Sequence, residues 1–285
     1  MDNLPAPGVY EDIPFDEYLA WDAVSSHDCM TMLRSPEYYL HSKTKKSDPS
    51  QAMLFGSACH EIVLTPETAS QHIAVKPDGM DRRTKIGKEL FAEFEKRSHG
   101  KMIISGSDER HIHNIAEAIS RHTIGAEYLE RCHRREESCL TQHKATGLMV
   151  RGRPDAFCED LVIDLKTTMD ARPESFAKTV HNFGYYVQAF AYLYLLRRLG
   201  VIQSTARFCF LVVEKLPPYQ VEVYELDPGD ILRGGELYTL ALQRISRCRS
   251  TNQYVSDSSI LKTVELPDYA RRAHDSRYST DTTDS

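Results

Sequence analysis

The spacing of apolar residues changes along this chain, and that change limits the folds it can adopt. Residues 84–97 and 107–122 place apolar side chains at helical spacing, whereas residues 134–166 alternate apolar and polar side chains as strands do. Helical spacing returns over residues 173–199, and two further strands follow. Strands in the middle of a chain with helices on either side predict an α/β fold, with a central mixed β-sheet flanked by helices.

Capping and turn residues set the limits of the individual elements. Ser25 and Ser26 stand where a helix N-cap would, and Pro36 is suited to begin a second short helix. A helix over residues 51–64 should end before the Thr65-Pro66 pair. Other helices are expected at 84–97, 107–122, 173–182, 186–199 and 230–249, and strands at 72–76, 134–142, 147–153, 161–166, 206–215 and 219–226.

The sequence contains no internal repeat and no long linker, so nothing marks a boundary between domains. We therefore expect one domain over residues 1–270, of which residues 1–50 form a helical N-terminal portion. Residues 271–285 lack the apolar side chains that a core needs and are expected to form a disordered tail.

The formal net charge of −6 argues against a protein that coats nucleic acid nonspecifically with a basic surface. An enzyme that acts on DNA through an acidic metal site and a local basic groove is still compatible with this total. Three basic clusters could line such a groove or could be ordinary solvated charges: Lys43, Lys45 and Lys46; Arg82, Arg83, Lys85 and Lys88; and Arg131, Arg134 and Arg135.

The cysteines are odd in number and scattered, which predicts free thiols that pack as small apolar side chains. None belongs to a CxxC pair, and the closely spaced C-terminal cysteines that an iron–sulfur cluster would need are missing: Cys29, Cys59, Cys132, Cys139, Cys158, Cys209 and Cys248. No apolar segment approaches the roughly 20 residues of a membrane span, and the N-terminus does not resemble a secretion signal. We therefore expect a cytoplasmic protein that does not enter membranes.

The stretch with the most chemical content is Gly152-Arg153-Pro154-Asp155, followed after eight residues by Asp164-Leu165-Lys166. In a strand, Asp164 and Lys166 share one face while Leu165 points to the other, and Asp155 ends the preceding strand. Two carboxylates without a neighbouring cysteine suit Mg²⁺, with Mn²⁺ as a substitute. A lysine beside them could orient or deprotonate an attacking water and offset charge on a phosphoryl group. The alternative is an exposed Asp164–Lys166 ion pair.

Two helices carry polar residues that fit the same site. In the helix over residues 51–64, Gly56 and His60 fall on one face, so small residues there would let the helix approach the sheet and direct His60 at the metal. In the helix over residues 186–199, Gln188 and Tyr192 form a polar pair on an otherwise apolar element. A lone histidine or glutamine can equally be a hydrogen-bonded structural group.

Taken together, these motifs resemble the RecB-type branch of the PD-(D/E)XK nuclease superfamily. The order GxxxH, GRPD, DLK and QxxxY is similar to that of the RecE-like nucleases of phage and prophage recombination systems, over about residues 9–249. The resemblance implies a restriction-endonuclease-like core in which His60, Asp155, Asp164 and the backbone carbonyl of Leu165 hold a metal. It also implies that Lys166 assists the nucleophilic water.

The same resemblance implies roles for several further residues. Gln188 and Tyr192 would contact the lysine, the scissile phosphate or the DNA end. Ser26 and Arg34 would bind a terminal phosphate at a helix N-terminus, although capping also explains a serine there. Glu136 and Glu137 are candidate accessory carboxylates, with solvated strand residues as the favoured interpretation.

The implied activity is a Mg²⁺-dependent exonuclease that degrades one strand of linear double-stranded DNA from the 5′ end and leaves a 3′ overhang for recombination. Its implied partners are double-stranded DNA ends, further copies of itself in a ring-shaped trimer or tetramer, and a single-strand annealing protein, in the cytoplasm of a bacterial host cell. Two alternatives remain: a structure-specific or single-strand DNA nuclease, and an inactive nuclease-derived protein that binds DNA or serves in assembly.

Overall fold

A computed structural model describes residues 4–45, 49–77, 83–256, 261 and 263–281 of the chain. These residues belong to two units, Met1–Tyr254 and Val255–Ser285. Lys46 and Arg82, which belong to two of the basic clusters, lie outside the described residues. Within the described part of the chain, no helix is both long and apolar enough to cross a membrane.

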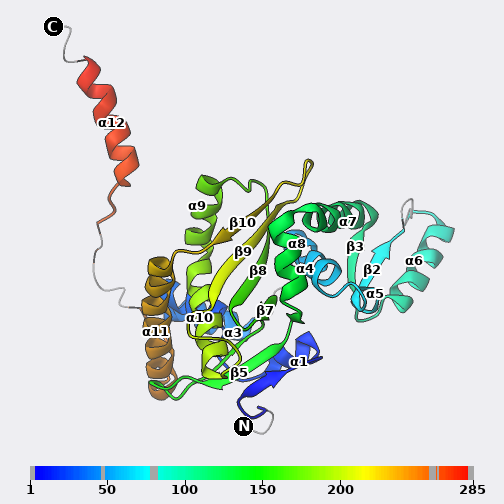
Figure 1. The fold of residues 1–285 in the computed structure, drawn as a ribbon, viewed down its shortest axis with the longest axis horizontal. Coiled ribbons are helices and arrows are strands. Elements are labelled where there is room, and N and C mark those ends of the chain that lie inside the picture. Colours follow the sequence, from blue (N-terminus) through cyan, green and yellow to red (C-terminus); the bar gives the residue numbers. More distant parts are fainter. Residues whose placement is uncertain (1–3, 46–48, 78–82, 257–260, 262, 282–285) are drawn as a thin grey trace. The chain divides into compact units, whose positions relative to one another are not determined.

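A five-stranded mixed sheet forms the centre of the first unit, with the strand order β10-β9-β8-β7-β4 (Figure 1). Strands β8 and β9 run parallel, and each of the other neighbouring pairs runs antiparallel. This confirms the expected fold class. The strands are β4 (Arg134–Arg135), β7 (Ala156–Cys158), β8 (Leu161–Thr168), β9 (Arg207–Glu214) and β10 (Val221–Glu225).

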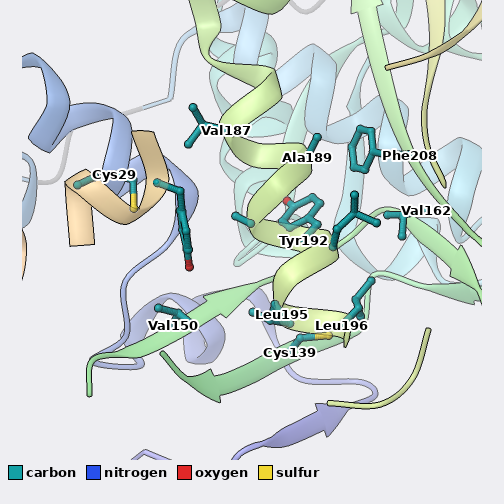
Figure 2. Close-up of a cluster of buried hydrophobic side chains, with 14 of the residues drawn as sticks. Cys29, Cys139, Val150, Val162, Val187, Ala189, Tyr192, Leu195, Leu196 and Phe208 are labelled. Atoms are coloured by element: carbon teal, nitrogen blue, oxygen red, sulfur yellow. The ribbon is translucent and has the colours of Figure 1, made fainter. Parts of the chain in front are cut away.

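Helices cover both faces of this sheet, so its strands alternate between two hydrophobic clusters. Val162 of β8 packs with Phe208 of β9 and Ala189 of α10 (Tyr185–Arg198), as Figure 2 shows. On the opposite face, Ile163 and Leu165 pack against α4, α7 and α8. The face that carries Asp164 is therefore covered by a helix, and the alternative of an exposed ion pair is wrong because Asp164 is fully buried.

Apart from α8, which was not predicted, the helices that form these layers follow the predicted limits closely. Proline at the first helical positions and serine or threonine caps account for most of the starts. On one face lie α2 (Ser26–Arg34), α3 (Pro36–Thr44), α9 (Pro173–Phe183), α10 and α11 (Pro228–Thr251); on the other lie α4 (Gln51–Leu64), α7 (Gly106–Arg121) and α8 (Thr123–Arg131).

Two adjacent glycines let α11 pack tightly against α10. A Cβ atom on Gly234 would overlap the backbone carbonyl of Tyr186, and one on Gly235 would overlap the ring of Phe190. The two helices therefore touch through backbone at this point, which fixes the position of α10 above the sheet.

The strand expected over residues 134–142 is in fact two strands in different sheets. Residues after the short β4 leave the central sheet, and β5 (Ser138–Gln142) joins β1 (Gly8–Tyr10) and β6 (Met149–Gly152) in a three-stranded sheet. The chain changes sheets at Glu136, which has a φ of 53°. The Glu136 amide donates a hydrogen bond to the carbonyl of Asp155, which stabilises this turn.

The remaining elements of the first unit are small. Strands β2 (Ile73–Lys76) and β3 (Met102–Ser105) form a parallel pair, and α6 (Lys85–Arg97) lies between them in the chain. Helix α1 (Phe15–Ala20) and the four-residue α5 (Ala69–His72) complete the set. The prediction missed α1, α5, α8, β1, β3 and β7, because short elements contain too few residues to establish a period.

The second unit contains α12 (Asp268–Asp281). The segment expected to be a disordered tail from residue 271 is thus helical as far as residue 281. The described side chains of residues 271–277 are all exposed, which agrees with the shortage of apolar residues noted in the sequence.

Candidate active site and metal centre

The candidate site lies at the edge of β8 where its pairing with β7 ends. Strand β7 pairs with β8 only from Leu161 to Ile163. Continuing the same register would place Pro154 opposite Leu165, and proline has no N–H to donate to a ladder. The ladder ends there, and the backbone groups of Leu165 on this edge need other partners.

Two side chains take the place of the missing strand. The Leu165 amide donates to Asp155 Oδ2 over 2.6 Å, and the Leu165 carbonyl lies 3.0 Å from His60 Nε2. Asp155 reaches this position because it directly precedes β7, and His60 because its helix α4 packs on the sheet through Ala58 and Cys59. The structure thus brings Asp155, His60 and the Leu165 carbonyl together at one strand edge.

The predicted reason for the approach of α4 is wrong in one respect. A Cβ atom on Gly56 would meet nothing within 4 Å, so this glycine is not needed for close packing. The contact with the sheet is made by the buried Ala58 and Cys59, which lie on another face of the helix. His60 is nevertheless directed at the strand edge.

Glu136 completes a group of three side chains that could hold a metal ion. One ligand atom from each of His60, Glu136 and Asp155 lies within 4.8 Å of the others. His60 Nδ1 is 3.5 Å from Asp155 Oδ1 and 3.6 Å from Glu136 Oε1. The favoured interpretation of Glu136 as a solvated strand residue is therefore wrong: its left-handed backbone turns it inward, while Glu137 forms a bidentate ion pair with Arg134.

Burial and these two carboxylates shift the pKa of His60 in opposite directions. Burial lowers the pKa of His60, but the charges of Asp155 and Glu136 outweigh burial and raise the pKa to about 9. Without a cation, the histidine thus carries a proton that offsets part of the negative charge of the cluster. A metal ion bound by the imidazole would take the place of that proton.

Asp164 and Lys166 lie next to this group on the face of β8 that α10 covers. Their side chains form a close ion pair, although neither Asp164 oxygen accepts a geometrically sound hydrogen bond from any described residue. Burial raises the pKa of Asp164 to about 6, with Lys166 opposing the shift. A buried carboxylate whose Oδ1 accepts no hydrogen bond from the described residues, close enough to Asp155 and His60 to interact with their charges, fits a hard divalent cation.

Burial and the neighbouring charges also shift the pKa values of Asp155 and Lys166. Burial and the neighbouring Glu136 raise the pKa of Asp155, while His60, Lys166 and the Leu165 amide oppose that shift. Burial lowers the pKa of Lys166, but Asp164 and Asp155 more than compensate and hold the pKa above its usual value. The lysine is therefore an ammonium ion in this arrangement and serves as a charge rather than as a free base.

Gln188 and Tyr192 contact each other, and burial together with the nearby charges of Asp164 and Asp155 raises the pKa of Tyr192. Gln188 Nε2 donates to the Tyr192 hydroxyl over 3.0 Å, so the two satisfy each other, and the Tyr192 ring packs on Gly152. The aromatic neighbour of the lysine is instead Tyr185, whose ring centroid lies 4.5 Å from Lys166 Nζ. Tyr185 could not be identified from the sequence, because a tyrosine at the start of an apolar helix is common.

Ser26 and Arg34, the candidates for binding a terminal phosphate, lie at the two ends of α2. Ser25, not Ser26, caps α2 through a capping box with Asp28, so Ser26 is the first residue of the helix. The Arg34 guanidinium stacks 3.5 Å from the Tyr38 ring centroid and donates to the Tyr38 hydroxyl. Neither contact brings Ser26 or Arg34 into the group around Asp155.

The third basic cluster does not form a free basic surface. Arg131 pairs with Asp160, and Arg134 pairs with Glu137. Arg135 donates to the carbonyls of Leu64 and Leu129, and so joins α4 to α8. These three arginines thus make ion pairs and hydrogen bonds within the protein around the site.

Comparison with known proteins places this site in a family. Residues 25–259 match the family described as "PDDEXK-like domain of unknown function (DUF3799)". The structure is similar to that of a protein named "Putative exonuclease" from Eubacterium rectale, with a TM-score of 0.59 and 12% identity over 90% of this chain and 96% of that one. At this identity the likeness concerns the fold alone.

A phage related exonuclease from Haemophilus somnus is more distant. It shares 12% identity over 68% of this chain and 95% of that one, with a TM-score of 0.28. Among the curated proteins, none matches the chain. The family match and the acidic site support a nuclease. With its family model matched over most of its length, the chain belongs to the PDDEXK-like family DUF3799.

Proposed function

We propose that this protein is a divalent-metal-dependent exodeoxyribonuclease that degrades one strand of linear double-stranded DNA from the 5′ end and leaves a 3′ overhang. The observation that carries the proposal is the group at the open edge of β8. There, His60, Glu136 and Asp155 gather beside the backbone of Leu165, and the close ion pair of Asp164 and Lys166 lies on either side of that residue in the strand. Such a concentration of ionisable groups inside a fold is costly and is typical of functional sites.

In this proposal, His60, Asp155, Asp164 and the Leu165 carbonyl hold Mg²⁺ or Mn²⁺, with Glu136 as a further carboxylate. The bound ion supplies charge stabilisation at a phosphoryl oxygen and a more acidic water. Lys166 keeps its charge through Asp164 and Asp155, and it orients the water and offsets charge on the phosphoryl group. Tyr185 limits the positions that the ammonium can take.

The preference for duplex ends rests on the resemblance to RecE-like nucleases. So do the terminal-phosphate roles of Ser26 and Arg34, the contacts of Gln188 and Tyr192 with substrate, the ring-shaped trimer or tetramer, and the annealing partner. A ring would predict a single species larger than a monomer in size-exclusion chromatography with light scattering. A monomer at every concentration would remove the ring but leave the chemistry intact.

The test is digestion of a 5′-phosphorylated linear duplex by the purified protein with Mg²⁺, beside closed-circular DNA of the same sequence. Loss of the linear duplex alone, abolished by EDTA and by Asp164→Asn, is the expected result. Equal cleavage of the closed circle would favour a structure-specific nuclease. Metal-independent DNA binding without cleavage, from a folded protein, would favour the inactive binding or assembly protein.

A further inference from the structure

Two of the cysteines lie next to each other behind the candidate site. The sulfur atoms of Cys132 and Cys158 are 2.8 Å apart, although the residues are separated by 26 positions in the chain. Cys132 ends α8 and Cys158 ends β7, so the contact joins a helix to the central sheet. A disulfide bond is about 2.05 Å long, so the two sulfurs need to approach each other by less than an ångström to be bonded.

The two thiols differ in their access to solvent. Cys132 is fully buried, and its sulfur contacts the carbonyl of Leu161 at 3.8 Å. Cys158 is half-buried and is the most accessible of the seven cysteines, since the other six are all buried. One thiol of the pair is thus exposed to a small oxidant, and the other is protected but within bonding reach.

Charged groups surround the exposed thiol. The pKa of the Arg131 guanidinium is raised, first by its contact with the Cys158 sulfur and also by Asp160. The guanidinium pairs with Asp160, whose carboxylate lies 3.4 Å from the same sulfur. The exposed sulfur thus lies beside a guanidinium and a carboxylate at once.

We propose that Cys132 and Cys158 are a site of reversible oxidation and form an intramolecular disulfide when the protein meets a peroxide. The Cys158 thiol is oxidised by hydrogen peroxide to the sulfenic acid with release of one water. The Cys132 thiol then attacks that sulfur. The S–S bond forms as the S–O bond breaks, and the hydroxyl leaves with the Cys132 proton as a second water. Two thiols are oxidised, and one peroxide is reduced to two waters.

The two cysteines lie close in sequence to two carboxylates of the candidate metal site. Glu136 follows Cys132 by four residues and Asp155 precedes Cys158 by three, and β4 pairs with β7 between them. A disulfide would therefore tie together the outer ends of the two strands whose inner ends present carboxylates to the candidate metal site. Formation of the bond does not depend on the proposed nuclease activity, so the two can be tested separately.

The test is to treat the folded protein with hydrogen peroxide in the presence of EDTA, block remaining thiols in urea with N-ethylmaleimide, and digest with trypsin without reductant. The expected product links the peptide of residues 132–134 to that of residues 152–166, and dithiothreitol separates them. The whole protein should lose two titratable thiols, and Cys158→Ser should lose none.

Cys248→Ala is the matched control, since it removes a cysteine on α11 far from the pair in sequence. This variant should still lose two thiols on oxidation. Both cysteines found blocked by N-ethylmaleimide after peroxide treatment would overturn the proposal. So would Cys158 linked to a different cysteine, or Cys158 converted to sulfinic acid beside a free Cys132.

Discussion

The two edges of β8 show how one strand can serve both stability and chemistry. On one edge β8 pairs with β9 along its whole length, from Leu161 opposite Arg207 to Thr168 opposite Glu214. On the other edge pairing with β7 stops at Ile163, and side chains from α4 and from the loop before β7 take over the backbone of Leu165. The candidate site thus lies where ionisable side chains, and not a neighbouring strand, bind the backbone of β8.

Placing ionisable side chains at the open edge of β8 lowers the stability of the folded state. The paired edge is flanked by fully buried apolar residues such as Phe210 and Leu211, whereas the open edge gathers carboxylates whose pKa values are raised by burial. A raised carboxyl pKa means that the folded state disfavours the charged form. Substitutions on the two edges should therefore act on different properties of the protein.

The largest effect is expected from Asp164→Asn on the open edge. Removing one metal-binding charge should slow DNA cleavage by about three orders of magnitude or more, because metal-based stabilisation is worth several kcal/mol and each 1.4 kcal/mol is a factor of ten. The metal-free variant should be at least as stable as the parent at pH 8, since a disfavoured buried charge is gone. Initial rates and thermal melts measure the two properties, and an unchanged rate would sink the assignment of Asp164.

Lys166→Met should give the next largest loss, about 10²–10⁴-fold in rate, because it keeps the apolar stem but removes the ammonium near the reacting phosphate. Unlike Asp164→Asn, it should retain metal binding, seen as an increase in Tm on adding Mn²⁺. A variant that cleaves DNA at the parental rate would show that the lysine is only a structural partner of Asp164.

A substitution beside the paired edge should lower the stability of the protein but leave the cleavage rate unchanged. Leu211→Ala removes a side chain that is 1% exposed, and it should lower the free energy of unfolding by about 2–5 kcal/mol. The cleavage rate per folded molecule should stay close to that of the parent at a temperature well below the Tm. Urea denaturation and active-fraction measurements test this, and a loss of rate without a loss of stability would contradict the division between the edges.

A smaller effect is expected from Glu136→Gln. Losing this carboxylate should weaken Mn²⁺ binding by about 10–100-fold, the range seen when groups around a metal are altered. It should also lower the pKa of His60 from about 9, since Glu136 is one of the two groups that raise it. Glu137→Gln is the control, because Glu137 pairs with Arg134 and should change neither quantity.

The smallest effect is a pH dependence of stability. His60 has a folded-state pKa of about 9 against an ordinary 6.5, so its contribution is present below pH 6.5 and lost as pH rises through 9. Asp164, with its pKa raised to about 6 from 3.8, also disfavours folding once ionised, but that loss of stability occurs between about pH 4 and 6 and is complete below the pH range in which the His60 contribution is lost. The Tm of the metal-free protein should therefore fall as pH rises from 6 to 9. The Tm increase on adding Mg²⁺ should grow over the same range, and an increase independent of pH would argue against His60 as a ligand.

The sequence predicted the sheet, its flanking helices and the residues around Leu165, because alternation, caps and spaced motifs are local properties. It predicted α4 with the observed limits, Gln51–Leu64, from its apolar composition and the Thr65-Pro66 stop. It did not predict the division of residues 134–142 between two sheets, since the backbone turn at Glu136 depends on a contact with Asp155 nineteen positions away.

The same limit explains the residues that were misplaced or missed. Tyr185 lies against Lys166 because α10 crosses β8 at a particular angle, and no spacing within α10 encodes that crossing. Gln188 and Tyr192 were grouped correctly as a pair, but their partner turned out to be each other. Periodicity identifies which side chains share a face, whereas packing between elements decides what that face touches.

The backbone contact between α10 and α11 has a consequence for anyone who redesigns this protein. Gly234 lies in the middle of a long helix, yet it admits no side chain because the Tyr186 carbonyl occupies the place of its Cβ. The neighbouring Tyr185 faces Lys166, so a single added methyl group on α11 would displace the helix that covers the lysine of the candidate site. In a library of surface and helix variants, the most conservative change on paper, glycine to alanine, would be among the least tolerated here.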